Sequence, residues 1–295
     1  MRDFRFGFTL HTHRSRRELA ETCRTAEAYG YDAAVAIDHL GPGRSSPFQA
    51  LLAAAHASER LRVGTYVLNV GFWNPSMLAR EVVTAVQLTG GRLELGLGTG
   101  LIKSEFDAAG IPWQTFGQRV DRLAATLDEL DRLLAAEQDV ARPPLLIGGT
   151  GDRALRLAAE RADIIGFAGI RQVPGKPAGT LRTATAAEAA EQVAFFRAAA
   201  GSRADDVELN NFVKVVEVTD DRRAAAERVV ADEDGYPTER AEDALQTPFM
   251  LIGTEQEIAQ QLVEDRERYG FSYITVMRPH LNVLGPIIKR VRSLA

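Results

Sequence analysis

Residues 61–100, LRVGTYVLNVGFWNPSMLAREVVTAVQLTGGRLELGLGTG, carry the pattern from which the architecture of the chain can be inferred. The apolar stretch Leu61–Leu68 is expected to be a strand. Asn74–Pro75 is an N-cap followed by a first-turn proline, and apolar residues then recur at helical spacing, at Leu78, Val82, Ala85 and Leu88. A glycine pair ends this helix, and Leu93–Leu97 is the next strand. The stretch therefore predicts a strand–helix–strand unit of a parallel sheet.

The same alternation extends toward both ends of the chain. Capping boxes at Ser15 with Glu18 and at Thr254 with Glu257 open two further helices. Alternation of this kind implies parallel strands with right-handed crossovers, either in an open doubly wound sheet or in a closed barrel. Eight units in 295 residues favour an α/β fold that is a single (β/α)8 TIM barrel over residues 1–295, with loop insertions at its C-terminal face. The expected strands are Arg5–Leu10, Ala33–Ile37, Leu61–Leu68, Leu93–Leu97, Leu145–Gly148, Ile164–Ala168, Val207–Val216 and Ser272–Met277.

Two segments do not fit the alternation. Arg171–Thr183 is rich in proline, glycine and basic residues, and is expected to be a mobile loop. A further insertion lies around Asp232–Gln246. Both are interpreted either as covers for a bound substrate or as ordinary surface loops.

Composition excludes several classes of protein. The chain is 45% hydrophobic and 25% charged, with a formal net charge of -5, as in ordinary globular proteins and without the basic excess of nucleic-acid-binding proteins. Its single cysteine, Cys23, cannot form an internal disulfide, and no histidine or cysteine cluster has the spacing of a metal site. Residues 1–10 lack the apolar core of about 7–15 residues that is typical of a signal peptide, and no run of 18 apolar residues occurs, so neither a signal peptide nor a membrane span is expected. We expect a cytoplasmic protein that binds no metal, nucleic acid or membrane.

Active sites of such barrels are built from the loops that follow the C-terminal ends of the strands. Three of the five histidines fall at these positions. The polar and glycine residues found there are His11, Asp38, His39, Asn69, Thr99, Gly100, Gly148 to Gly151, Lys214, Arg278 and His280. Asp38 and His39 together suggest an oriented imidazole for proton transfer, and the alternative is a structural histidine.

The segment Gly149-Thr150-Gly151-Asp152-Arg153-Ala154 matches the G-x-G-x-x-A dinucleotide fingerprint. Two observations exclude NAD. No carboxylate lies about 20 residues further on, where Gly169 stands, and four strand–helix units precede the motif. The segment remains compatible with a phosphate clamp at a helix N-terminus or with a tight turn that needs small residues.

An ordered set of motifs resembles the bacterial luciferase-like family of flavin and deazaflavin barrels. The similarity is best from residue 1 to about residue 168 and again from Ile252 to Met277. The motifs are Ala28-Tyr29-Gly30-Tyr31-Asp32, Asp38-His39, Gly90-Gly91-Arg92-Leu93-Glu94-Leu95-Gly96-Leu97-Gly98-Thr99-Gly100, Gly110-Ile111-Pro112-Trp113 leading to Arg119, Leu146-Ile147-Gly148-Gly149 and Arg161-Ala162-Asp163.

Within that family, residues 64–69 followed by Asn74–Pro75 resemble the branch that depends on the deazaflavin coenzyme F420. The resemblance implies a cis peptide bond between Tyr66 and Val67, behind the deazaflavin ring, and it implies a homodimer. It also implies hydride transfer between F420 and a small organic substrate, with His39 handling the proton and Asp38 fixing its ring. The residues implied to line the deazaflavin are Asp38, Tyr66, Val67, Asn69, Thr99, Gly100 and Ser104, and those implied to hold its phosphate are Gly149, Thr150, Gly151, Arg153 and Ala154.

The chain also departs from its resemblance to the F420-dependent sugar-phosphate dehydrogenases. Those enzymes carry a glutamate directly after Thr-Gly and a tryptophan shortly after Asp-His, where this chain has Leu101 and Leu40-Gly41-Pro42-Gly43. The difference argues against glucose 6-phosphate as the substrate. One alternative function is an FMN-dependent monooxygenase served by a partner reductase. Another is a barrel that binds a cofactor or metabolite without catalysis.

Overall fold

Eight parallel strands close into a barrel, as the sequence predicts. The computed structural model describes residues 2–10, 15–137, 140–176, 180–232 and 238–294. The strands follow one another in the order β3-β2-β1-β13-β10-β7-β6-β5, and pairing of β3 with β5 completes the ring. Their bounds are β1 Arg5–Leu10, β2 Ala33–Ala36, β3 Arg62–Thr65, β5 Leu93–Gly98, β6 Leu145–Gly148, β7 Ile164–Phe167, β10 Glu208–Val213 and β13 Phe271–Val276.

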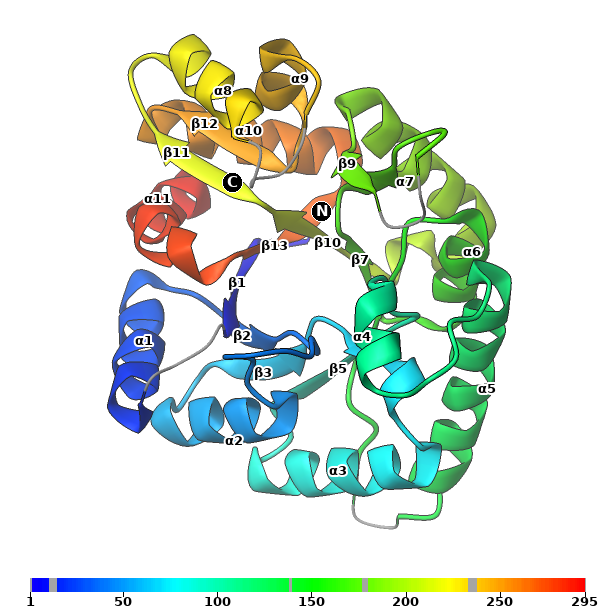
Figure 1. Cartoon of the computed structure of the whole chain (residues 1–295). Coiled ribbons are helices and arrows are strands. Elements are labelled where there is room, and N and C mark those ends of the chain that lie inside the picture. Colours follow the sequence, from blue (N-terminus) through cyan, green and yellow to red (C-terminus); the bar gives the residue numbers. More distant parts are fainter. Residues whose placement is uncertain (1, 11–14, 138–139, 177–179, 233–237, 295) are drawn as a thin grey trace.

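Helices surround the barrel (Figure 1), and capping residues set where several of them begin. Thr115, Thr185 and Thr254 open α5, α7 and α10 with complete capping boxes. Ser15 caps α1 by accepting from the Glu18 backbone N–H, whereas the Glu18 carboxylate binds Arg278. The helices are α1 Arg16–Tyr29, α2 Pro47–Ala57, α3 Pro75–Leu88, α4 Lys103–Ala108, α5 Phe116–Leu134, α6 Asp152–Arg161, α7 Ala186–Ala200, α8 Arg222–Ala231, α9 Ala241–Gln246, α10 Glu255–Tyr269 and α11 Leu281–Leu294, with short 3-10 turns η1 Val70–Phe72, η2 Gly201–Asp205 and η3 Arg278–His280.

The apolar core has two layers. Outward-facing strand residues and the inner faces of the helices form the larger layer. A smaller cluster fills the barrel itself, with Val35, Tyr66, Leu146, Ile164 and Tyr273 among its members. Because successive strand residues point to opposite faces, strands such as β2, β6 and β7 contribute to both layers.

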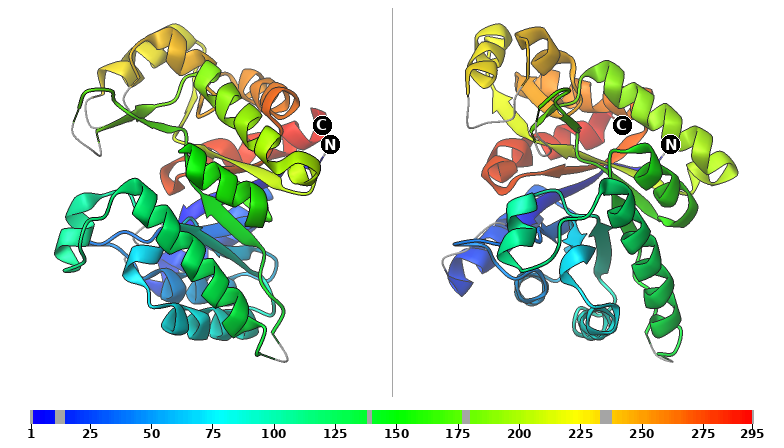
Figure 2. Two further views of the ribbon diagram at one scale, coloured as in Figure 1. Left: turned by 90° about the vertical axis from the view of Figure 1, so that its right-hand side faces the viewer. Right: turned by 45° about the vertical axis from the view of Figure 1, so that its right-hand side comes forward.

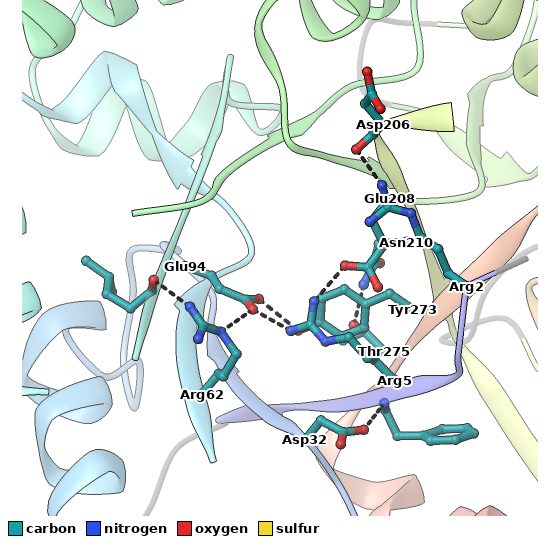
Figure 3. A network of polar contacts seen from close by, with 12 residues as sticks. Arg2, Arg5, Asp32, Arg62, Glu94, Asp206, Glu208, Asn210, Tyr273 and Thr275 are labelled. Atoms are coloured by element: carbon teal, nitrogen blue, oxygen red, sulfur yellow. Dashed lines mark hydrogen bonds and ion pairs between the residues drawn. The ribbon is translucent and has the colours of Figure 1, made fainter. Parts of the chain in front are cut away.

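A layer of paired charges fills the N-terminal end of the barrel (Figure 3). Glu94 of β5 accepts from Arg5 of β1 and, at 2.6 Å, from Arg62 of β3. Arg5 also binds Glu208 of β10 at 2.6 Å, and its guanidinium lies 4.3 Å from the ring centroid of Tyr273. Both glutamates are buried, so this end of the barrel is closed by ion pairs.

Two expected strands are divided in the structure. The stretch Leu61–Leu68 forms β3 and then β4, Leu68–Asn69, with the Tyr66–Val67 peptide between them. Val207–Val216 forms β10 and then β11, Val215–Val218, which leaves the barrel and pairs in parallel with β12, Met250–Gly253. The division occurs at Lys214, a buried residue whose ammonium donates to the backbone oxygen of Gly169.

The two insertions also contain regular structure. Arg171–Thr183, which was expected to be a mobile loop, contains strand residues in its described part: β8, Ile170–Gln172, and β9, Leu181–Thr183, pair as an antiparallel hairpin, and residues 177–179 lie outside the described residues. The second insertion ends in α9, which lies beside α8 (Figure 1); Figure 2 shows the same part of the chain from two other sides. A small apolar cluster joins α8, α9 and β12. Across the described ranges, no helix is both long and apolar enough to span a bilayer.

Candidate functional site

Asp38 connects the ends of two strands at the C-terminal face of the barrel. It follows β2, and its side chain is buried. Its Oδ2 accepts from the Asn69 backbone N–H at 3.1 Å and from Trp73 Nε1 at 2.9 Å. Burial raises the pKa of Asp38, and the hydrogen bonds from Trp73 and Asn69 oppose that shift. These bonds fix the loop after β2 against the loop after β4.

His39 is held by a glutamate that the sequence did not single out. Its Nδ1 lies 2.9 Å from Glu105 Oε1 and 3.2 Å from Glu105 Oε2. The expectation that Asp38 fixes the ring is wrong, because Asp38 binds Asn69 and Trp73 while the carboxylate on the imidazole belongs to Glu105 of α4. With Nδ1 engaged as a donor to a carboxylate, neutral His39 carries its lone pair on Nε2.

Tyr66 and Val67 lie across the inside of the barrel. The peptide bond between them is cis, as the resemblance implies. The Tyr66 ring stacks on Phe212, with centroids 5.1 Å apart and an interplanar angle of 16°. The Val67 side chain packs against β5, since a Cβ at Gly98 would lie 2.5 Å from Val67 Cγ2. Together these side chains form an apolar floor beneath the strand ends.

The floor contains a buried hydroxyl without a partner. Tyr66 Oη is inaccessible to solvent and has no hydrogen bond among the described residues. Burial raises the pKa of this phenol, which therefore stays protonated and keeps a donor to offer. A buried unsatisfied hydroxyl of this kind is compatible with a bound group that supplies an acceptor.

Asn69 and Gly100 bring the ends of β4 and β5 together. Asn69 Oδ1 accepts from the Gly71 N–H at 2.9 Å. Gly100 has φ +74°, and a Cβ there would lie 2.5 Å from the Asn69 amide, so this position requires glycine. Thr99 precedes it, and Ser104 is exposed in the first turn of α4, next to Glu105.

The glycine segment after β6 leads into α6. Gly151 is the N-cap of this helix, and no side chain caps it. A Cβ at Gly149 would lie 2.6 Å from Ala154 Cβ, so a glycine is needed for the chain to fold this closely over the first turn. Arg153 pairs with Asp121 at 2.5 Å in an exposed position. The first-turn N–H groups of α6 are thus open to an anion, with an arginine beside them.

The floor of Tyr66 and Val67 and the glycine segment after β6 are in direct contact. A Cβ at Gly148, the residue before the glycine segment, would lie 3.1 Å from Val67 Cγ1. Other residues at strand ends make separate contacts: Lys214 binds Gly169, Arg278 binds Glu18, and His280 Nε2 lies 2.9 Å from the Lys214 backbone oxygen. His11 lies outside the described residues. In the described part of the chain, no cluster of three or more histidine, cysteine, aspartate or glutamate residues is arranged to hold a metal ion.

A cavity of about 410 Å³ opens beside Asp38 and His39. It lies between the loop after β2 and the start of α3, and its size is in the range of small-molecule sites. Apolar and aromatic side chains contribute much of its lining, including those of Leu40, Phe72, Trp73 and Met77.

The site residues fit a deazaflavin nucleotide in three respects. The floor of Tyr66 and Val67 is apolar, and a planar ring can pack on such a surface. The unpartnered Tyr66 hydroxyl, which lies against Gly166 of β7, keeps a donor. The uncapped N-terminus of α6 offers N–H groups to a phosphate.

Comparisons with known proteins give one family match and several partial relatives. A family model described as luciferase-like monooxygenase matches residues 3–273. An F420-dependent glucose-6-phosphate dehydrogenase of Intrasporangium calvum is 36% identical over 131 residues, which is 41% of this chain and 39% of the relative. A 4-hydroxyprotoasukamycin monooxygenase of Streptomyces nodosus subsp. asukaensis is 34% identical over 128 residues, which is 42% of this chain and 33% of the relative. The matches therefore span about two fifths or less of these relatives.

Solved structures show the same barrel. One of them, an F420-dependent secondary alcohol dehydrogenase in complex with an F420-acetone adduct, has a TM-score of 0.77 with 17% identity and covers 98% of both chains. At this level of identity the similarity establishes the fold.

Proposed function

The chain belongs to the luciferase-like monooxygenase family, and we propose that it is an F420-dependent oxidoreductase acting on a small organic substrate. The observation that carries this proposal is His39, held at Nδ1 by Glu105 beside a cavity at the C-terminal face of the barrel. An imidazole fixed in this way is suited to proton transfer. The similarity to F420-dependent glucose-6-phosphate dehydrogenases supports the choice of cofactor.

The residues proposed to hold F420 lie around the floor and the start of α6. Ring binding is assigned to Asp38, Tyr66, Val67, Asn69, Thr99, Gly100 and Ser104, and phosphate binding to Gly149, Thr150, Gly151, Arg153 and Ala154. When bound, the deazaflavin accepts or donates a hydride, while the substrate interconverts a hydroxyl and a carbonyl group and so loses or gains one proton.

His39 accepts or donates that proton at Nε2. Glu105 keeps the Nδ1 proton in place by accepting its hydrogen bond, so the exchangeable site on the neutral ring is Nε2. In alcohol oxidation Nε2 takes the hydroxyl proton, and the imidazolium formed is stabilised by the Glu105 carboxylate. In carbonyl reduction the same nitrogen returns the proton. Asp38 acts on the loop that carries His39 rather than on its ring.

The alternative that a specific observation favours is an FMN-dependent monooxygenase. One relative of 34% identity is named as a monooxygenase, and an apolar floor also suits a flavin ring. Such an enzyme needs reduced FMN, oxygen and a reductase. The third alternative is a protein that is not an enzyme: a barrel that binds a cofactor or metabolite without catalysing a reaction.

The test is a parallel fluorescence titration of the protein with F420 and with FMN, followed by a redox assay with the cofactor that binds. We expect saturable binding of F420 in the micromolar range or tighter. Tight FMN binding without F420 binding would overturn the choice of cofactor.

A pair of variants tests the role of His39. His39→Ala should lower turnover about 100-fold or more while leaving F420 affinity nearly unchanged, because general acid–base catalysis contributes roughly 10²–10⁴-fold. His56→Ala is the matched control, since His56 is exposed on α2. Equal turnover in the two variants would remove His39 from the mechanism.

A further inference from the structure

We propose that Gln192 is a positioning residue for the cofactor phosphate: it orients the glycine segment after β6 so that backbone N–H groups at the start of α6 are ready to bind the anion. The inference rests on the proposed function and adds a residue that the sequence did not single out. Three observations carry it: where Gln192 lies, which peptide unit it binds, and which N–H groups that peptide unit leaves open.

Gln192 is a polar residue on the buried face of α7. The other buried residues of this helix are apolar and recur at helical spacing, at Ala189, Val193, Phe196 and Ala200. Gln192 is 3% exposed, and α7 packs against α6 (Figure 1). A buried amide in an apolar face is costly unless it is hydrogen-bonded, so its hydrogen bond indicates why a polar side chain stands there.

Among the described residues, the Gln192 side chain makes one hydrogen bond, to the glycine segment. Its Nε2 donates to the backbone oxygen of Thr150 at 2.9 Å, across 42 positions of sequence. Its Oε1 is buried and has no hydrogen bond in the described part of the chain. Turning the amide over would place Oε1 against the Thr150 oxygen, and both are acceptors, so the contact requires the Nε2 donor.

The bond to Thr150 also fixes the direction of the Gly151 N–H. The Thr150 C=O and the Gly151 N–H belong to one trans peptide unit, so they point in opposite directions. Because the oxygen is turned toward α7, the Gly151 N–H points away from that helix. Within the described ranges, the backbone N–H groups of residues 151–154 make no hydrogen bond. Gln192 therefore orients the first of the open donors at the N-terminus of α6, where anions bind.

The glycine segment needs a contact of this kind. Glycines allow many backbone conformations, and donors that must first be ordered bind an anion more weakly than donors already in place. Arg153, the charged side chain at this point, is exposed and paired with Asp121, so it does not hold the segment. Gln192 holds it from the buried side, opposite the open N–H groups.

The first experiment measures phosphate binding without the cofactor. Amide NMR of the cofactor-free protein, titrated with inorganic phosphate, should show saturable shifts at Gly151, Asp152 and Arg153. Gln192→Met keeps the size of the side chain and removes the donor. Its phosphate affinity should be about tenfold weaker, as is typical when an orienting partner is removed. Equal phosphate affinity in Gln192→Met and the parent, or a parent without shifts at these amides, would overturn the proposal.

Gln261→Met is the matched control. Gln261 of α10 also donates from Nε2 to a backbone oxygen, that of Met250 at 3.0 Å, and its Oε1 is also buried without a partner among the described residues. This bond joins α10 to β12, both of which lie apart from α6 (Figure 1). The two substitutions remove equivalent bonds, so a general loss of stability would weaken phosphate binding in both variants. The proposal predicts the loss in Gln192→Met alone.

The second experiment compares the cofactor with a form that lacks the phosphate. The parent and the variants are titrated with F420 and with FO, the deazaflavin without its phosphate. Gln192→Met should bind F420 about tenfold more weakly and FO as the parent does, because FO has no group to meet the oriented N–H donors. Gln192→Glu, which sets a carboxylate against the Thr150 oxygen, should weaken F420 binding further. Equal loss of affinity for F420 and FO would contradict the proposal.

The failure of this inference is distinguishable from the failure of the proposed function. Phosphate binding at the start of α6 that depends on Gln192, in a parent that does not bind F420, would reject the cofactor and leave the role of Gln192 standing. Equal F420 affinity in the parent and Gln192→Met would reject the role of Gln192 alone.

Discussion

His39 and Glu105 define the chemistry of the site at the scale of single residues. Their contact joins the loop after β2 to α4 across 66 positions of sequence. A carboxylate on Nδ1 orients the imidazole and selects its tautomer, and such orienting partners typically contribute 10–100-fold to activity where they have been removed from other sites. Glu105 acts through His39, so it is a positioning residue.

Two substitutions at position 105 separate orientation from charge. Glu105→Leu should lower kcat about 10–100-fold with little change in KM, because the ring is no longer held. Glu105→Gln keeps an oxygen acceptor for Nδ1–H, so its kcat should lie between those of the Leu variant and the parent. Its pH–rate profile should also shift, because a neutral amide stabilises the imidazolium less than a carboxylate does.

Nitrogen NMR of the cofactor-free protein provides a readout independent of turnover. The His39 ring should show the Nδ1–H tautomer in the parent and in the Gln variant, and a mixture of tautomers in the Leu variant. An unchanged tautomer in the Leu variant would show that Glu105 does not position the ring.

The floor of the site depends on the absence of a side chain at position 98. In Gly98→Ala the new Cβ would lie 2.5 Å from Val67 Cγ2, so Val67 has to move. We expect a loss of about 1–3 kcal/mol in the free energy of unfolding, measured in urea, and weaker F420 binding. The double variant Val67→Ala, Gly98→Ala removes the clashing methyl groups and should recover part of both losses. A double variant worse than the sum of the single ones would contradict this account.

The sequence indicated some of the candidate site residues and missed another. Asp38, His39, Asn69 and Gly100 could be selected because residues after barrel strands face one end of the barrel. Glu105 could not, since it lies in a six-residue helix without a repeating pattern, and its contact with His39 depends on how that helix folds back over the barrel. The signal that the sequence offered was a carboxylate in the loop region that follows β5, where site residues of such barrels lie.

At the scale of elements, helices bordered by caps and glycines were predictable and divided strands were not. Thr254 opens α10 with the expected capping box, and Gly270 ends it in a left-handed conformation, so the backbone groups at both ends are satisfied. The run Val207–Val216 appeared as one strand because its apolar residues continue through the break. The chain leaves the barrel at Lys214 only because β12, more than thirty residues further along, supplies a second partner for β11.

Helix α10 carries a buried carboxyl group that makes its stability depend on pH. Asp265 is buried, and its Oδ2 has no hydrogen bond among the described residues. Burial raises the pKa of Asp265 to about 7. Between its ordinary value near 4 and this value, the folded state holds a proton that the unfolded chain has released. The free energy of unfolding therefore falls as pH rises through this window and stays low above it.

Asp265→Asn removes this titration. Relative to the parent, the variant should gain stability between pH 4.5 and pH 8, by up to about 4 kcal/mol for a shift of this size. Urea unfolding at the two pH values measures the difference. Glu267→Gln, at an exposed position of the same helix, should show no such gain relative to the parent at either pH value. A parent whose stability rises over this range relative to Asp265→Asn would refute the assignment.

At the scale of the whole molecule, the two ends of the barrel have separate tasks. The C-terminal end carries the cavity and His39, and the N-terminal end is closed by the charges of Arg5, Arg62, Glu94 and Glu208. This division is why the barrel was easier to predict than the site: eight alternations specify the barrel, and loops of irregular length build the site. The ion pairs at the N-terminal end were not predicted. A charged residue within a strand does not indicate which residues of the other strands will lie opposite it inside the barrel.

Glu94 is the residue on which closure of the barrel most depends. It is 3% exposed, accepts from Arg5 and Arg62, and lies 3.3 Å from the Tyr273 hydroxyl, so it joins β1, β3 and β13 to β5. Glu94→Gln leaves two guanidinium groups facing a neutral amide in a buried layer. Breaking a buried pair in this way costs about 3–5 kcal/mol, and urea unfolding should show a loss of that size. Glu129→Gln, which affects a surface pair with Arg132, should cost far less. The layer lies at the end of the barrel opposite the cavity. F420 affinity, measured at low temperature where both variants are folded, should therefore stay the same in both. A Glu94→Gln protein that kept its stability but lost F420 binding would contradict this separation of tasks.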